Sequence, residues 1–194
     1  MSCGFVRPSV IYPYKGPEAD HGDLLKNLGF EADFRPNGAM YYVGFGMIIE
    51  LLGPDKGRGA KDGRIHIEKL HISALALRYI DILLENNTSI GIHGVGKISI
   101  PSMPAFMLHK LLVAPLRSDA AKKAKDTMQI HSIAKRILPD ESLMEETARI
   151  FRTMPRRWHS RITASAKAMK EHLPEDQQND ITSMVITRAS TMDA

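Results

Sequence analysis

The sequence is almost devoid of cysteine, since Cys3 is the single one among 194 residues. One thiol cannot form an internal disulfide, and no Cys/His spacing typical of a zinc site is present. The chain also has no apolar run near the roughly 18 residues that a membrane helix needs. Its first residues show no charged segment followed by an apolar stretch, so we expect no signal peptide. These absences favour a cytoplasmic protein that does not enter the membrane.

Several catalytic signatures are missing as well. The eight histidines form no H-E-x-x-H pattern, and no Ser/His/Asp or Cys/His arrangement has a recognisable spacing. The glycine-rich stretch from Gly53 to Gly59 does not fit the phosphate-loop pattern G-x-x-x-x-G-K-[ST]. The sequence therefore gives no support for a zinc protease, a Ser/His/Asp hydrolase or a P-loop enzyme.

Positive charge is present and unevenly distributed. The segment from Met103 to Leu173 contains 14 Lys and Arg against 7 Asp and Glu, a net +7, whereas the whole chain carries +4. The remainder is therefore −3. A basic C-terminal half suits a phosphate-rich partner, although a solvated basic face explains the same charge equally well.

The hydrophobic pattern predicts an α+β protein, with strands first and helices afterwards. We expect a mixed sheet with flanking helices over residues 1–102, a helical domain over 103–175 and a flexible tail over 176–194. The predicted strands are Val6–Tyr12 and Tyr41–Leu52, with a hairpin around Gly94–Gly96. The predicted helices are Asp23–Leu28, Ile72–Asn86, Pro104–Val113, Asp119–Leu138, Glu141–Thr153 and Pro155–Leu173.

Glu50 is the first residue that could carry chemistry. It interrupts the apolar strand Met47–Leu52, and a carboxylate among such residues is costly unless it is paired or binds a metal. It could be a metal or site carboxylate at the surface of the sheet. Alternatively, it lies at a strand edge and reaches solvent or a neighbouring lysine.

Asp126 is the second such residue. On a helix from Asp119 it shares a stripe with Ile130, Ile133 and Ile137, so it points the same way as the apolar face. Lys122 and Lys123 lie one turn before it. The group could face a phosphate or nucleotide, or Lys122 and Asp126 could form an ordinary helix salt bridge worth about 0.3–0.5 kcal/mol.

Other basic residues are candidates for anion binding. Lys110 lies in an otherwise apolar helix, where it could snorkel to solvent or point into a cleft and bind phosphate. Arg117 follows near the helix end, where it could bind an anion or complement the helix C-terminus. The segment Arg156–Arg161 joins basic residues to the only tryptophan, a mixture that can bind nucleic acid or simply pack its helix onto the bundle.

Several short sequence segments between Leu28 and about Leu138 resemble those of a known family. They are listed here in chain order: Leu28-Gly29-Phe30, Ile49 to Pro54, Ala74 to Leu84, Ile98 to Pro101, Pro104 to Leu111, Arg117, and Lys122 through Lys125 and Asp126 to Gln129. Their order and spacing resemble bacterial minimal nucleotidyltransferases of the polymerase-β-like superfamily, which are related to nucleotidyltransferase toxins of abortive-infection systems.

The resemblance implies a site in which carboxylates hold Mg²⁺ and the metal binds a nucleoside triphosphate. It places Glu50 as a catalytic, metal-binding carboxylate and Asp126 as a second catalytic acid. Substrate binding falls to Lys110, Arg117, Lys122, Lys123 and Lys125. We expect Glu50, Lys110 and Asp126 to share one cleft.

In that family, two carboxylates of a G-S…D-x-D motif hold the metal together with a third carboxylate on a later strand. This sequence has no such motif. The segment where D-x-D is expected, Arg7 to Ile11, contains no acid, which suggests a truncated or degenerate front end. With one of three carboxylates present, metal affinity and phosphoryl transfer would both be weak.

Three functions therefore stay open. The chain could transfer a nucleotide from a nucleoside triphosphate to RNA or another acceptor. It could be a non-catalytic protein that binds nucleotide, nucleic acid or a protein partner. It could also be an interaction module that pairs an exposed sheet edge with a second copy to form a homodimer.

Overall fold

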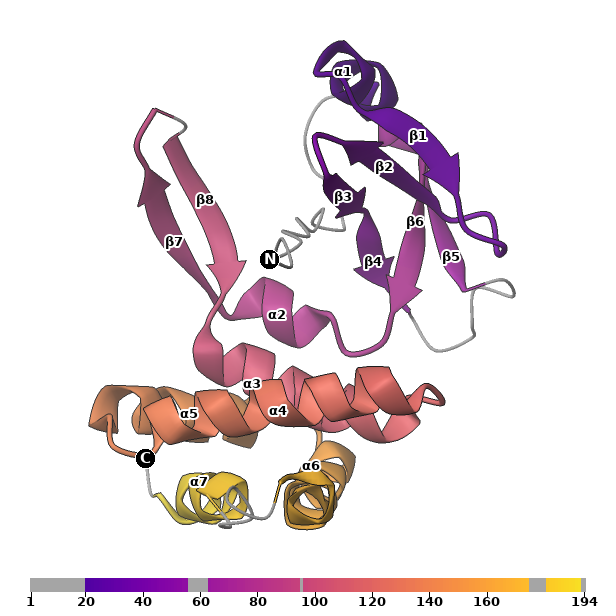
Figure 1. Ribbon diagram of the computed structural model, residues 1–194. Coiled ribbons are helices and arrows are strands. Elements are labelled where there is room, and N and C mark those ends of the chain that lie inside the picture. The colour runs from indigo at the N-terminus through magenta and orange to yellow at the C-terminus, as the bar shows by residue number, and fades with distance from the viewer. Residues whose placement is uncertain (1–19, 56–62, 95, 175–180, 193–194) are drawn as a thin grey trace. The chain divides into compact units, whose positions relative to one another are not determined.

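The computed structural model describes residues 20–55, 63–94, 96–174 and 181–192. The chain divides into two compact units, one ending at Ile80 and the other beginning at Asp81. Small sheets come first and helices follow, which confirms the predicted α+β class (Figure 1). The predicted boundary after residue 102 differs from this division, because the hairpin and the short helix before it group with the later helices. The predicted strand Val6–Tyr12 lies outside the described residues.

The first unit contains two three-stranded sheets. Its elements are α1 (His21–Asn27), β1 (Glu31–Phe34), β2 (Met40–Gly44), β3 (Met47–Glu50), β4 (Leu52–Pro54), β5 (Arg64–Ile67), the 3₁₀ turn η1 (Glu68–Leu70) and β6 (Ile72–Leu77). One sheet has the antiparallel order β1-β2-β3, and the other has the order β4-β6-β5. The predicted helix Asp23–Leu28 is confirmed as α1. Tyr42, Leu70, Ile72 and Ala74 are fully buried and form the core of this unit.

The predicted single strand Tyr41–Leu52 is wrong, because a tight turn divides it. Gly44 pairs with Met47 across the turn, so only Phe45 and Gly46 connect β2 to β3. Both connecting residues have positive φ, 52° and 72°, as a two-residue hairpin of the right twist requires. After Glu50 the chain leaves this sheet and enters the other one as β4. The glycines on either side of Phe45 were the signal for the turn.

The predicted helix Ile72–Asn86 is also wrong. Ile72–Leu77 is the central strand β6, paired with β5 on one side and β4 on the other, and only Asp81–Glu85 is helical. A short apolar run such as Ile72–Leu77 cannot be told from a buried helix segment by periodicity alone. Tyr79, with φ 62°, adopts a left-handed conformation that ends the extended backbone of the strand before the helix begins.

The second unit is helical apart from one hairpin. Its elements are α2 (Asp81–Glu85), β7 (Asn87–Ile92), β8 (Gly96–Pro101), α3 (Met103–Val113), η2 (Ala114–Leu116), α4 (Ala120–Ile137), α5 (Glu141–Thr153), α6 (Arg156–Ala168), η3 (Met169–His172) and α7 (Ile181–Thr191). The predicted hairpin and the helices α3 to α6 are confirmed in position. Over the described ranges, no helix is long and apolar enough to cross a membrane.

Helix α3 is the centre of this unit. Met107, Leu108 and Leu111 are fully buried, and α3 contacts α2, α4, α5 and α6 (Figure 1). The side chain of Ser102 caps the first turn by accepting a hydrogen bond from the backbone N–H of Ala105. A helix that is apolar around most of its circumference must be covered on several sides, which is what the surrounding helices do.

Residues 181–191, predicted to be part of a flexible tail, form the helix α7. It lies beside α6 and contacts α4 and α5 as well (Figure 1). Val185, Ile186 and Ala189 are buried. Arg188 pairs with Glu141, and Arg152 donates a hydrogen bond of 2.7 Å to the carbonyl of Met192. Three apolar residues at helical spacing pack α7 against the other helices. The polar residues around them made this segment resemble a tail in the sequence.

We expect Ile186→Ala to lower the free energy of unfolding by about 2–4 kcal/mol, because it removes buried methyl and methylene groups and leaves a cavity. Urea unfolding followed by circular dichroism measures the change. Met184→Ala is the matched control, since Met184 lies on the exposed side of the same helix. Equal stabilities for the two variants would show that α7 does not pack on the bundle.

His131 on α4 predicts a pH dependence of stability. It is buried, and neither ring nitrogen has a hydrogen-bond partner among the described residues. Burial, with a smaller contribution from the charge of Lys135, lowers the pKa of His131 below 6.5. Protons therefore bind the unfolded chain more readily, and stability should fall as pH drops below about 6.5. His131→Leu should flatten this slope in unfolding experiments between about pH 5 and 7, while His93→Gln in the exposed hairpin should not.

Candidate functional site

Asp126 is held on the packed face of α4. Asp119 accepts a hydrogen bond from the backbone N–H of Lys122 and so fixes the start of the helix at Ala120. That hydrogen bond also lowers the pKa of Asp119. From this start, helical periodicity turns Asp126 inward with Ile130 and Ile137, all three of which are buried. The predicted orientation of Asp126 is confirmed.

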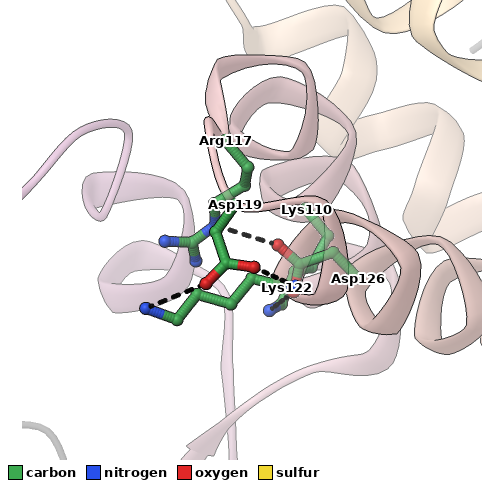
Figure 2. A network of polar contacts seen from close by, with 5 residues as sticks. All are labelled: Lys110, Arg117, Asp119, Lys122 and Asp126. Carbon is green, nitrogen blue, oxygen red and sulfur yellow. Dashed lines mark hydrogen bonds and ion pairs between the residues drawn. The ribbon is translucent and has the colours of Figure 1, made fainter.

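The carboxylate of Asp126 binds two cations. The Nζ atom of Lys110 lies 2.5 Å from Oδ1, and the Nε atom of Arg117 lies 3.2 Å from Oδ2 (Figure 2). Lys110 comes from α3, and Arg117 follows η2 in the connection to α4. One carboxylate therefore ties together α3, the connection and α4. The structure brings together three of the residues that the sequence singled out.

The alternative prediction, a helix salt bridge between Lys122 and Asp126, is wrong. Lys122 instead pairs with Asp119, at 3.7 Å between Nζ and Oδ2. The ends of Lys122 and Arg117 extend to the same side of the cluster in Figure 2. Lys122 and Lys125 are exposed and Lys123 is half-buried. Neither Lys123 nor Lys125 forms an ion pair with a described residue.

Exposure increases outward through the Asp126 cluster, by which we mean Lys110, Arg117 and Asp126. The exposed fractions of the side chains are 6% for Asp126, 15% for Lys110 and 38% for Arg117. The ammonium of Lys110 also lies 5.2 Å from the ring centroid of Phe106, a favourable cation–π position. An ammonium has three N–H donors and a guanidinium has five, so one contact each to Asp126 leaves donors for an incoming anion.

Glu50 has a different environment, in the first unit. It ends β3, is buried, and forms an ion pair with Arg35. Arg35 also lies over the ring of Tyr41, 5.4 Å from its centroid, and Tyr41 is the residue opposite Glu50 in the register of β2 and β3. The sequence left open whether Glu50 serves a site at the sheet surface or reaches solvent at a strand edge, and the structure buries it. The lysine suggested as its partner is in fact an arginine that carried no signal in the sequence.

A second carboxylate on the same sheet face also escaped prediction. Asp33 is opposite Tyr41 on the other side, and the Tyr41 hydroxyl donates a hydrogen bond to it. This hydrogen bond lowers the pKa of Asp33 and raises the pKa of Tyr41. Only the strand register brings Asp33, Tyr41 and Glu50 into one row, and a register is not visible in a single sequence.

The described residues show no grouped ligands for a metal ion. The Glu50 carboxylate faces a guanidinium, and the described ranges contain no group of three or more His, Cys, Asp or Glu residues placed to hold a metal ion. The predicted D-x-D position near Arg7–Ile11 lies outside those ranges. The metal role of Glu50 and its predicted cleft with Lys110 and Asp126 stay predictions, since Glu50 belongs to the first unit and the other two to the second.

Comparison with known proteins identifies the family. A family model described as nucleotidyltransferase matches residues 4–150, about three quarters of the chain. The chain belongs to this nucleotidyltransferase family. No curated protein and no solved structure gives a significant match. The family match includes Glu50 and the Asp126 cluster and ends within α5, so α6 and α7 of this nucleotidyltransferase-family protein lie beyond it.

We expect Asp126→Asn to lower the free energy of unfolding by about 3 kcal/mol. The amide keeps the shape of the side chain but leaves two cations without their counter-charge, a loss that typically costs 3–5 kcal/mol when buried. Solvent around the partly exposed Arg117 reduces the cost. Urea unfolding measures it, and Glu141→Gln, which breaks the exposed pair with Arg188, should cost about 0–1 kcal/mol. Equal losses would show that the Asp126 cluster is not a buried network.

Proposed function

We propose that this protein binds the triphosphate of a nucleoside triphosphate at Lys110 and Arg117 and transfers the nucleotide to RNA or another acceptor. Membership of the nucleotidyltransferase family supports the reaction class. The single observation that carries the binding site is the pair of cations fixed on the Asp126 carboxylate, each with N–H donors remaining.

The electrostatics of the cluster favour a phosphate. Two cations and one carboxylate leave a net charge of +1, and the nearby Lys123 and Lys125 are not neutralised by any described residue. Both phosphate-binding side chains are already held in place by Asp126, so little of their conformational freedom is lost on binding. Hydrogen bonds between ionised donors and phosphate oxygens are about twice as strong as neutral ones, and partial burial strengthens them further.

The proposed chemistry is attack of an acceptor hydroxyl on the α-phosphorus. The new ester bond forms as the bond to the bridging oxygen breaks, the hydroxyl loses its proton, and pyrophosphate leaves. Negative charge grows on the pyrophosphate during this step. Lys110 and Arg117 would stabilise that charge if the β- and γ-phosphates lie against them. Mg²⁺ enters this proposal through the family resemblance alone, since the described carboxylates do not form a site for it.

A second candidate is a non-catalytic protein that binds nucleotide without transferring it. The observation in its favour is Glu50, which is engaged by Arg35 rather than presented to an open site. An ion pair of this kind satisfies a buried carboxylate without any ligand. Binding and transfer therefore have to be measured separately.

We expect Arg117→Gln to weaken the binding of ATP, GTP, CTP and UTP about 10- to 100-fold. Hydrogen bonds to charged groups contribute about 1.5–3 kcal/mol, and each 1.4 kcal/mol is a factor of ten in Kd. Isothermal titration calorimetry measures the affinities, and circular dichroism verifies the fold of the variant. Lys97→Gln in the exposed hairpin is the control that removes one positive charge elsewhere. The absence of nucleotide binding by the wild-type protein would refute the proposal.

Transfer is tested with α-³²P-labelled nucleotides, single-stranded RNA and Mg²⁺. Label in RNA that decreases in Arg117→Gln supports the enzyme, whereas nucleotide binding without label supports the non-catalytic candidate. Omitting Mg²⁺ and adding a chelator shows whether transfer depends on a metal.

A further inference from the structure

Helix α6 presents a basic surface that the proposed nucleotide site does not use. Helical periodicity of 100° per residue places its exposed residues on one arc. The exposed residues of this arc are Arg156, Arg157, Ser160, Arg161, Ala164, Lys167 and Ala168. We call this arc the α6 basic face. Four of its members are cationic, the others are small, and α6 contains no acidic residue.

The opposite side of α6 is packed and holds the helix in place. Ile162, Ser165 and Ala166 are buried, and α6 contacts α3 and α7. The ring of His159 stacks on Phe151 of α5, with 4.3 Å between centroids and 21° between planes. These contacts fix the first turns of α6, so the α6 basic face is presented by a rigid element.

The charges at the start of α6 are not compensated within the described chain. The side chains of Arg156 and Arg157 form no hydrogen bond or ion pair with any described residue, unlike those of Arg149, Arg152 and Arg188. They also occupy the first turn, where the helix dipole disfavours cations. An approaching polyanion would relieve both the mutual repulsion and the unfavourable dipole interaction.

We propose that the α6 basic face binds the phosphodiester backbone of RNA. Arginines supply planar donor groups that suit phosphate oxygens, and Ser160, Ala164 and Ala168 leave space for a backbone to approach between them. The α6 basic face offers no large apolar side chain that could enter a lipid bilayer, as membrane-surface helices require. The choice of RNA over DNA rests on the RNA acceptor of the proposed function. The recognition of phosphate by the arginines does not depend on that proposed function.

The α6 basic face lies beyond the family match, which ends at residue 150. The RNA-binding surface that we propose therefore lies on α6, a helix that the family match does not include. Because α3 packs against both α4 and α6, the nucleotide-binding and RNA-binding surfaces proposed here belong to one folded unit.

The test is fluorescence anisotropy with a labelled 20-nucleotide single-stranded RNA between 50 and 200 mM KCl. Arg156→Gln/Arg157→Gln should weaken binding several-fold and reduce the salt slope by roughly 1.4, since each phosphate contact on a single strand contributes about 0.7. Lys135→Gln/Arg136→Gln on the exposed side of α4 is the matched control, because it removes the same charge and should leave binding nearly unchanged. Equal losses in the two double variants, or no RNA binding by the wild-type protein, would overturn the proposal.

Two further arms separate the sources of the anion. DNA of the same sequence should bind more weakly than RNA; equal or tighter binding overturns the choice of RNA. Vesicles of phosphatidylserine and phosphatidylcholine should not bind. If the protein sediments with them and Arg156→Gln/Arg157→Gln abolishes this, the α6 basic face binds a membrane instead.

Calorimetry with ATP keeps this proposal distinct from the previous one. Arg156→Gln/Arg157→Gln should bind ATP like the wild type, so RNA binding without ATP binding would refute only the nucleotide site.

Discussion

The carboxylate of Asp126 is the contact on which the arrangement of the second unit depends. Its two oxygens bind Lys110 from α3 and Arg117 from the connection that leads into α4. A shift of either helix along its axis would separate these partly buried charges, so the network favours one relative position of α3 and α4.

The sequence was informative where the periodicity of a single helix determines which way a side chain points. Periodicity alone predicted that Asp126 points the same way as Ile130 and Ile137, and the apolar neighbours of Glu50 indicated that its carboxylate needs a partner. The partners of these two acids could not be predicted in the same way. Arg117 reaches Asp126 only because η2 redirects the chain after α3, and Arg35 reaches Glu50 only through the register of an antiparallel sheet. Contacts that depend on chain reversal leave no local signal.

The same reasoning explains the errors in the fold. Ile72–Leu77 was predicted as a helix because a short apolar run is compatible with either a strand or a helix segment. Its pairing with β4 also joins residues that are distant in the sequence, although β5 precedes it directly through η1. Residues 181–191 were assigned to a tail because their few apolar residues stand among polar ones. Tertiary contacts with α4, α5 and α6 supplied the stabilisation that composition did not indicate.

A buried charged cluster is a poor device for stability alone. The cost of removing charges from water is commonly as large as their mutual attraction, so well-packed apolar residues would hold α3 and α4 together equally well. What apolar residues cannot do is hold an ammonium and a guanidinium with spare donors at a fixed separation. The Asp126 cluster retains that capacity through the graded exposure from Asp126 to Arg117. The triphosphate site that we propose would use this capacity, because its two cations would be positioned before the nucleotide arrives.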